Sequence, residues 1–305
     1  MLRLQSKREE LRIMAKWMIG IIGGSGVYDF PGLEDARWQT VKTPWGAPSD
    51  DIRIGRLEGV DVAFLPRHGR GHVIPPHDIN YLANIDAMKR IGVTDIISVS
   101  ACGSFREELA PGTFVLVDQF IDRTAGRHSS FFGTGLVAHV SMATPVSSRL
   151  IDMLAHAAHA NNISCRRGGT YVTMEGPQFS SVAESRLYKS WGCDVIGMTA
   201  MPEAKLAREA EMGYATVAMV TDYDCWHPHH DAVDVEAVVR ILLQNASASQ
   251  NLLRSFLSNL PGTRPSCPQG FDHALDNAII TAAEKRDPAL IAKLDAVAGR
   301  VLKRG

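Results

Sequence analysis

Short apolar runs rich in β-branched residues alternate with segments of helical periodicity along most of this chain, and this alternation limits the folds open to it. Strands are predicted at residues 17–22, 52–57, 60–65, 95–100, 114–117, 170–173, 194–196 and 214–221. Helices are predicted at residues 80–91, 147–160, 181–191, 202–211 and 235–257 and around 288–302. Since strands that alternate with helices form a sheet covered on both faces, we predict an α/β fold in which helices flank a central mixed, largely parallel β-sheet.

Composition and charge favour one domain that binds a small molecule. A length of 305 residues would allow two domains, but no linker divides the chain, so we predict an N-terminal extension at residues 1–16 and a single domain at residues 17–305. Lysine and arginine number 32 against 33 acidic residues, and no basic stripe with interleaved aromatic residues occurs. We therefore expect no nucleic acid as a partner.

Cysteines and apolar runs indicate the compartment. The five cysteines are an odd number and lie far apart, which suggests neither a disulfide framework nor a paired-cysteine zinc site. No apolar run approaches the length that crosses a bilayer, and the first sixteen residues are too charged for the core of a signal peptide. We expect a cytoplasmic protein with no membrane partner.

Two acids, Asp222 and Asp224, follow the apolar strand predicted at residues 214–221. Because side chains alternate along a strand, both carboxylates are expected on one face at its carboxyl end, where open α/β sheets bind their ligands. Crowded like charges in a partly desolvated site raise one carboxyl pKa, and a carboxyl that is protonated near neutrality can act as a general acid. An acid pair in an ordinary turn, capping the next helix, remains the alternative.

The first predicted strand ends in a glycine-rich turn, residues 20–26. Its glycines allow the backbone to approach a ligand closely, and Ser25 adds a hydroxyl, so the turn is suited to an anion. It is not the dinucleotide fingerprint, because Asp29 stands where a glycine is required, and no Lys-Ser or Lys-Thr pair completes a P-loop. A plain glycine-rich turn remains open.

Anion binding is also predicted for residues 66–72, which we call the Arg-His loop. Arg67, His68, Arg70 and His72 stand there among glycines, directly after a predicted strand. Since a guanidinium presents a planar fork of donors that matches an oxyanion, we expect phosphate in this loop, with a solvated basic loop as the alternative.

Small and polar residues follow three more predicted strands, at residues 98–104, 174–179 and 197–199. Each segment has an ordinary explanation in tight packing or loop structure. Taken together, the strand ends predict one pocket that binds an anion on one side and a flat polar ring on the other.

These motifs, in this order, resemble the trimeric purine nucleoside phosphorylase family, and within it the methylthioadenosine phosphorylases. The resemblance covers residues 18–283 through GGSG at 23–26, PRHGRGH at 66–72, SACGS at 100–104, MEGPQF at 174–179, GMT at 197–199 and TDYDCW at 221–226. It implies that inorganic phosphate cleaves 5′-methylthioadenosine to adenine and 5-methylthioribose 1-phosphate, in purine and methionine salvage. It also implies that neither a metal nor an organic cofactor is needed. A broader purine nucleoside phosphorylase, acting on adenosine or methylthioinosine, is the alternative.

The resemblance also assigns site residues. Phosphate is expected at Ser25, Arg67, His68, Ser100, Ala101 and Thr199. The nucleoside is expected at Cys102, Gly103, Phe179, Met198, Asp222, Asp224, Val235 and Val238, and at His139 of a neighbouring subunit. A residue shared in this way implies an oligomer, expected to be a homotrimer with an active site between subunits.

Within this assignment, Phe179 lies against the purine, Met198 lies against the ribose, and the two acids face N7 and the 6-amino group of the base. A protonated Asp222 would donate to N7 of the departing adenine, while Asp224 would accept from the 6-amino group and repel a 6-oxo group. An apolar helix face that includes Val235 and Val238 would receive the methylthio group, although such faces usually belong to the core.

Residues 227–231 form a histidine cluster that is not part of the family pattern, and a metal site or a pH-sensitive lid both remain open for it. Two other kinds of protein are also considered. Arg67-His68-Gly69 resembles the histidine phosphatases, in which the histidine is phosphorylated, but the acid pair is then unexplained. A nucleoside-binding module without catalysis would keep both pockets but leaves the general acid without a purpose.

Overall fold

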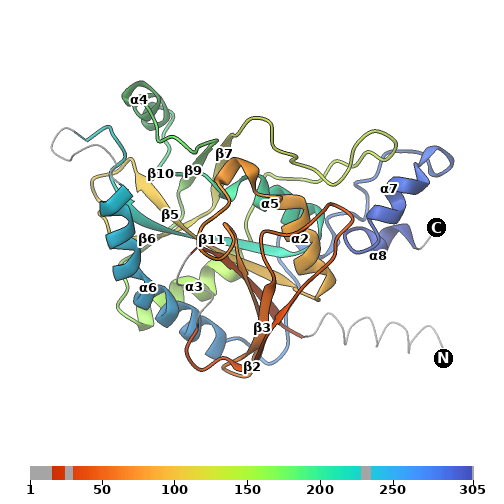
Figure 1. Cartoon of the computed structure of the whole chain (residues 1–305), viewed down its shortest axis with the longest axis horizontal. Helices are drawn as coiled ribbons and strands as arrows, with labels where there is room; N and C mark the ends of the chain where they lie inside the picture. The colour runs from red at the N-terminus through yellow and green to blue at the C-terminus, as the bar shows by residue number, and fades with distance from the viewer. Residues whose placement is uncertain (1–15, 25–29, 228–234, 304–305) are drawn as a thin grey trace.

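A single mixed β-sheet forms the centre of the protein in the computed structural model, which describes residues 16–24, 30–227 and 235–303, with only the backbone for 235, 237–240 and 242–244 (Figure 1). Its main path runs β2 (Glu34–Gln39), β3 (Ile52–Leu57), β4 (Val60–Pro66), β1 (Met18–Gly23), β5 (Asp95–Ser104), β10 (Val195–Gly197), β9 (Thr170–Met174) and β7 (Gln119–Arg123). From β5 the sheet also branches through β11 (Gly213–Asp222) and β6 (Phe114–Val117) to β8 (Cys165–Arg167).

Helices cover both faces of this sheet. The helices of the described chain are α2 (Tyr81–Arg90), α3 (Ser148–Ala160), α4 (Val182–Ser190), α5 (Ala200–Glu209), α6 (Val235–Ser258), α7 (Pro288–Lys293) and α8 (Gly299–Leu302), with short 3₁₀ turns at Pro76–Asp78, Phe271–His273 and Ala283–Lys285. Of these, α3, α5 and α6 pack directly against strands of the sheet. Helix α3 packs against α6 and α2 against α5, and Figure 1 shows these two pairs on either side of β11. Because both faces are covered, β5 and β11 are buried along nearly their whole length.

Strand β5 brings the candidate site residues together. Its first half lies parallel to both β1 and β11, and its second half pairs with β10 in the antiparallel sense while it continues beside β11. The carboxyl ends of β1, β4, β5 and β11 therefore meet at one edge, as expected for the binding edge of a parallel α/β sheet.

The predicted α/β class is confirmed. Among the described residues six strand pairings are parallel and four are antiparallel, so the sheet is mixed and largely parallel. Strands β2, β7 and β8 were not predicted, because they carry no sustained apolar run or alternation. The final predicted helix is divided into α7 and α8, and no helix in the described ranges is long and apolar enough to cross a membrane.

Candidate active site

The glycine-rich turn and the Arg-His loop begin side by side. Strands β1 and β4 are parallel and in register, with Gly23 opposite Pro66, and the backbone N–H of Arg67 donates to the carbonyl of Gly23 at 2.9 Å. The predicted phosphate residue Ser25 lies outside the described residues, but the chain enters its segment directly beside the loop that carries Arg67 and His68. Two segments predicted to bind one anion are therefore adjacent at Gly23 and Pro66.

Arg67 is the most constrained side chain of this edge, with 1% of its surface exposed. Its Nε and Nη2 contact the carboxylate of Glu203 at 2.9 and 3.1 Å, and Nη2 also donates to the hydroxyl of Ser98 at 2.7 Å. Nη1 and Nη2 reach the carbonyls of Val99 and Ile22, both at 3.2 Å. Burial alone would lower the pKa of Arg67, but the adjacent Glu203 carboxylate raises it. The guanidinium therefore stays charged.

The hydrogen bonds of Arg67 differ from those expected. A fork of free donors was anticipated, whereas most of its hydrogens bind Glu203 and neighbouring groups of the protein. Arg67 thus joins β4, β5 and α5, and its charge contributes to the potential at the site from a fixed position.

His68 is held in one tautomer. Its Nδ1 lies 2.9 Å from the carbonyl of Ile74, which can only accept, so Nδ1 carries the hydrogen of the neutral ring and Nε2 keeps a lone pair. Burial, together with the charge of Arg67, lowers the pKa of His68 to about 4. The ring stacks on His72 with centroids 4.2 Å apart, and His72 itself has a left-handed φ of 56°. The neutral imidazole presents an acceptor at Nε2.

The second half of β5 is close to the end of β10. The hydroxyl of Ser100 lies 3.5 Å from the phenol oxygen of Tyr171, and this phenol occupies the space beside Gly197, where an added Cβ would come within 1.8 Å of it. Only glycine fits at 197 for this reason. Thr199, two residues further on, is 5% exposed at the N-terminus of α5, and its side chain makes no capping hydrogen bond there.

Asp222 and Asp224 meet around Gly103. An added Cβ on Gly103 would lie 2.9 Å from Oδ1 of Asp222 and 3.3 Å from Cβ of Asp224, so the absence of a side chain makes room for both acids. The predicted reason for their proximity was wrong. Strand β11 ends at Asp222, and Asp224 lies in the following turn with a left-handed φ of 51°, so strand alternation does not place it. The turn brings it back because its N–H donates to Oδ1 of Asp222 at 2.8 Å.

The surroundings of Asp222 favour its protonated form. Burial raises the pKa of Asp222 and also that of Asp224, which is 4% exposed. The hydroxyl of Thr221 lies 2.7 Å from Oδ2 of Asp222 and 3.2 Å from the carbonyl of Cys102. When Asp222 carries a proton, Thr221 can direct its own hydrogen to Cys102 and accept from the acid, so both protonation states have partners.

The segment after β9 forms another wall near the acids. Met198 packs against Gly176, whose φ of 69° suits glycine and where an added Cβ would come within 2.5 Å of the methionine sulfur. The thiol of Cys225, next to Asp224, lies 3.2 Å from the carbonyl of Ser180, which ties the acid turn to this segment. Phe179 is 44% exposed, so its ring is accessible from outside the chain.

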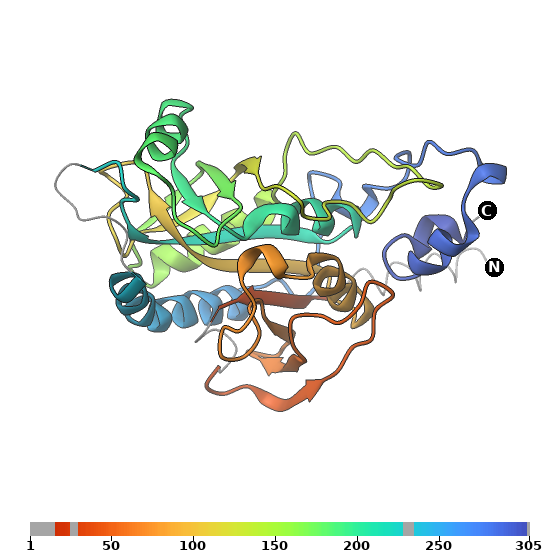
Figure 2. The same ribbon diagram turned by 45° about the horizontal axis from the view of Figure 1, so that its top comes forward.

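One predicted residue, His139, lies away from this edge in its own chain, and others lie outside the described residues. His139 is exposed, and the strand-like segment that contains it pairs with residues 278–281, running toward α7 and α8 (Figure 2). The side chains of Val235 and Val238, and the histidines at 229 and 230, lie outside the described part. No group of side chains suited to a metal ion occurs among the residues that are described.

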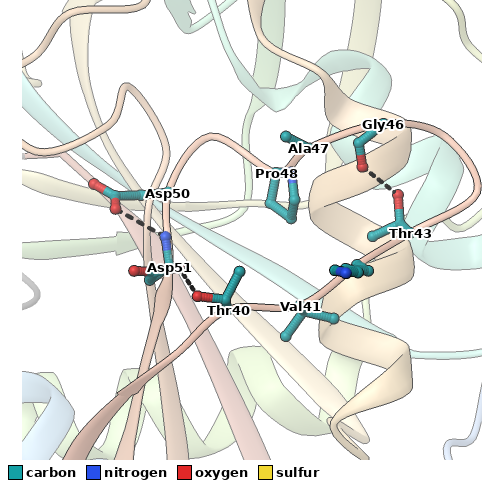
Figure 3. Close-up of a pocket in the computed structure, with 9 residues that line it drawn as sticks. Thr40, Val41, Thr43, Gly46, Ala47, Pro48, Asp50 and Asp51 are labelled. Carbon is teal, nitrogen blue, oxygen red and sulfur yellow. Dashed lines mark hydrogen bonds between the residues drawn. The ribbon is translucent and has the colours of Figure 1, made fainter.

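The two described hollows of the surface lie elsewhere. One, of about 470 Å³, is lined by residues of the 40–51 segment (Figure 3), and the other, of about 610 Å³, lies among residues 44–45, 77–82, 126–133 and 290–293. Neither is lined by a residue predicted for phosphate or nucleoside. Convergence of side chains at the strand ends therefore locates the candidate site.

Sequence reasoning did not find Glu203, Tyr171 or Arg127. Glu203 and Tyr171 are buried polar groups inside predicted elements, and each is revealed only by the partner that it contacts across the sheet. No local pattern in the sequence marks either contact.

The comparisons with known proteins identify the family of the chain. Residues 18–258 match the model of the phosphorylase superfamily. The chain belongs to the phosphorylase superfamily. This phosphorylase is 64% identical over 288 residues to the S-methyl-5′-thioadenosine phosphorylase of Cereibacter sphaeroides, covering 94% of this chain and 99% of that protein.

Solved structures of the superfamily are also similar. A methylthioadenosine phosphorylase from an antarctic soil metagenomic library shares 45% identity with a TM-score of 0.87, covering 92% of this chain and 99% of that one. A variant of the adenosine/methylthioadenosine phosphorylase from Schistosoma mansoni, in complex with methylthioadenosine, shares 38% identity with a TM-score of 0.75, covering 80% of this chain and 91% of that one. The predicted family and fold are thereby confirmed.

Proposed function

We propose that this phosphorylase cleaves 5′-methylthioadenosine with inorganic phosphate, releasing adenine and 5-methylthioribose 1-phosphate. The observation that carries the proposal is that Asp222 and Asp224 meet around Gly103 on strand β5. Strand β5 pairs with β1, and β1 pairs with β4, which leads into Arg67 and His68. The acids and the predicted phosphate residues therefore lie at the same edge of the sheet. The relatives named as methylthioadenosine phosphorylases, similar over nearly the whole chain, support the substrate.

Phosphate binds, in this proposal, where the glycine-rich turn, the Arg-His loop and the N-terminus of α5 meet. Ser25, Ser100 and Thr199 supply hydroxyls, Ala101 supplies its backbone, and Arg67 supplies positive charge from its buried position. His68 contributes an acceptor at Nε2, which suits the single hydroxyl of hydrogen phosphate. The remaining oxygens of the dianion carry the charge needed for attack.

Adenine departs with help from Asp222. A protonated Asp222 donates its hydrogen to N7 as the glycosidic bond breaks, so that the base leaves as a neutral molecule and Asp222 becomes a carboxylate. Asp224 accepts from the 6-amino group, which selects adenine over a 6-oxopurine. Phe179 and Met198, with the strand at Cys102 and Gly103, enclose the base and the ribose.

Phosphate then forms the new bond to the anomeric carbon. As the bond to N9 breaks, the sugar acquires oxocarbenium character, and the dianion beneath it stabilises that charge before one of its oxygens attacks. Hydrogen phosphate loses its single proton as the new C–O bond forms, and this proton replaces the one that Asp222 gave to the base. The products therefore balance without an external oxidant, reductant or further proton donor. We therefore propose that the reaction needs neither a metal nor an organic cofactor.

The 5′ end of the substrate is proposed to lie against Val235 and Val238 and against His139 of a neighbouring subunit. Two observations support this arrangement. His139 is exposed, and its segment runs away from the strand ends of its own chain. The active protein is accordingly proposed to be a homotrimer in the cytoplasm, acting in purine and methionine salvage.

One assay tests the proposed function. Purified protein is incubated with methylthioadenosine, adenosine or inosine, each with and without phosphate, and the free base is measured. We expect adenine release that requires phosphate and is fastest with methylthioadenosine. Comparable rates with all three nucleosides would favour a broader purine nucleoside phosphorylase, and a phosphorylated His68 during turnover would favour the histidine phosphatase chemistry.

A further inference from the structure

Arg127 is a buried arginine that lies outside the glycine-rich turn, the Arg-His loop and the other motifs at the strand ends. It lies in the segment between β7 and α3, and only 2% of its side chain is exposed. A guanidinium is costly to bury unless its donors are matched, so its contacts show what holds it in place.

On one side, Arg127 joins two segments predicted to contact the nucleoside. Its Nε lies 3.1 Å from Oε2 of Glu175, and Nη2 donates to the carbonyl of the same residue at 2.6 Å. Nη1 donates to the carbonyls of Met198 and Met201, both at 2.8 Å. One side chain therefore fixes the end of β9 to the connection between β10 and α5, where Met198 and Thr199 stand.

On the other side, Arg127 reaches the segment that follows the Arg-His loop. Nη1 lies 3.0 Å from the phenol oxygen of Tyr81, and this phenol donates to the carbonyl of Pro76 at 3.0 Å. Burial raises the pKa of Tyr81, so the phenol keeps its hydrogen for that bond. The guanidinium carbon also lies 5.3 Å from the centre of the Tyr81 ring. Two residues before Pro76, Ile74 accepts the hydrogen of His68.

We propose that Arg127 is a positioning residue that holds the nucleoside-side segments and the phosphate-side loop in a fixed relation. The inference rests on the proposed function, since it concerns the alignment of phosphate with the sugar. Reacting atoms must approach to about 3–3.5 Å, and a displacement of about 1 Å can lower the rate roughly 10²-fold. Arg127 touches neither ligand in this account and acts through Glu175, Met198 and Tyr81.

Only an arginine meets these requirements. Its planar fork reaches acceptors in several directions at once, whereas a lysine has a single nitrogen and could serve only part of the set. Arg123, four residues earlier, provides a matched control, because it is exposed at the end of β7, with its guanidinium 5.9 Å from the Trp191 ring.

The test compares Arg127→Ala, Arg127→Lys and Arg123→Ala with the wild type. For each, kcat and both KM values are measured in phosphorolysis, adenine binding is measured without phosphate, and thermal unfolding is recorded. We expect kcat of both Arg127 variants to fall roughly 10²-fold, with adenine binding largely retained. Guanidinium ion added to Arg127→Ala should restore part of kcat, and Arg123→Ala should behave as the wild type.

A purely structural role gives a different result. Folded Arg127→Lys with wild-type kcat would overturn the inference, as would a loss of adenine binding equal to the loss of kcat. If Arg127→Ala does not fold, Arg127→Lys alone decides between these outcomes. Absence of phosphate-dependent adenine release by the wild type would instead refute the proposed function, so the two failures are distinguishable.

Discussion

The backbone N–H of Asp224 donates to Oδ1 of Asp222 at 2.8 Å, so the two acids of the candidate active site form one unit and not two independent side chains. This bond occupies one oxygen of Asp222, while Oδ2 lies against the hydroxyl of Thr221. A change that moves the Asp222 carboxyl or the Asp224 backbone therefore alters the position of the other residue, and their separate roles are best tested by substitutions that keep the shape of the carboxyl group.

Asp222→Asn tests the general acid. The amide keeps the size of the side chain but cannot release a proton to N7, so kcat for methylthioadenosine should fall by roughly 10²–10⁴-fold. A nucleoside analogue whose leaving group needs no protonation should lose much less. The two substrates are compared by steady-state kinetics, and an equal loss with both would argue against proton donation by Asp222.

Asp224→Asn tests the choice of base. The amide can donate to a 6-oxo group and no longer repels it, so preference should move toward inosine-type nucleosides. A gained or lost hydrogen bond in a buried site changes the free energy by about 1–3 kcal/mol, which corresponds to roughly 5-fold to 150-fold in the ratio of kcat/KM values. An unchanged ratio of adenosine to inosine in the phosphorolysis assay would count against this role.

Gly103→Ala tests the space in which the two acids meet. The new methyl would lie 2.9 Å from Oδ1 of Asp222 and 3.0 Å from Cγ2 of Ile196, so one of these groups must move. We expect a loss of about 1–3 kcal/mol in the free energy of unfolding, together with reduced kcat. Gly262→Ala is the control, because an added Cβ there meets no atom within 4 Å. Denaturant unfolding and kinetics on both variants check the expectation.

The main strands and helices could be predicted because they carry strong periodic patterns. Buried β11, for example, is one continuous apolar run that leads to Asp222. The convergence of the strand ends followed from the class of fold, since the carboxyl ends of parallel strands lie at one edge. The proximity of Asp222 and Asp224 was also predicted, but for the wrong reason, because a left-handed turn and its hydrogen bond cannot be read from residue spacing.

Contacts between distant residues were beyond the reach of sequence patterns. Arg67 and Glu203 are 136 residues apart, and nothing in the local sequence of either reveals the other. Arg127 likewise contacts residues that precede it and follow it by more than 40 positions. Such polar contacts depend on the packing of β4, β5 and α5, which periodicity predicts only as elements and not in their relative positions.

Glu203→Gln tests the buried pair that fixes Arg67. Oε1 and Oε2 of Glu203 accept from Arg67, and Oε1 also accepts from the phenol of Tyr214 at 3.0 Å. The NH₂ group of the glutamine amide would face an N–H of Arg67 or the O–H of Tyr214, and Arg67 would lose its counter-charge. Removing one partner of a buried ion pair costs about 3–5 kcal/mol. We expect a matching fall in the free energy of unfolding and a higher KM for phosphate. Unaltered unfolding in urea would refute this account of the pair.

Glu209 should give the stability of the protein a specific pH dependence. Burial raises the pKa of Glu209 to about 7, while Ser130 and the N–H of Phe131 donate to its carboxylate, both at 2.7 Å. Between pH 4.5 and about 7, Glu209 therefore keeps in the folded state a proton that it has released in the unfolded state. The contribution of Glu209 to the free energy of unfolding is fully present below pH 4.5. It falls as pH rises and is lost once pH passes about 7.

Glu209→Gln removes this titration while keeping an acceptor for Phe131. Each unit of pKa shift corresponds to about 1.4 kcal/mol, so the difference in unfolding free energy between wild type and variant should change by about 3 kcal/mol from pH ~4.5 to pH ~7. The variant gains relative to the wild type as pH rises. Urea unfolding of both proteins at several pH values measures the difference, and general effects of pH cancel between them. A constant difference across this range would show that Glu209 ionises normally in the folded protein.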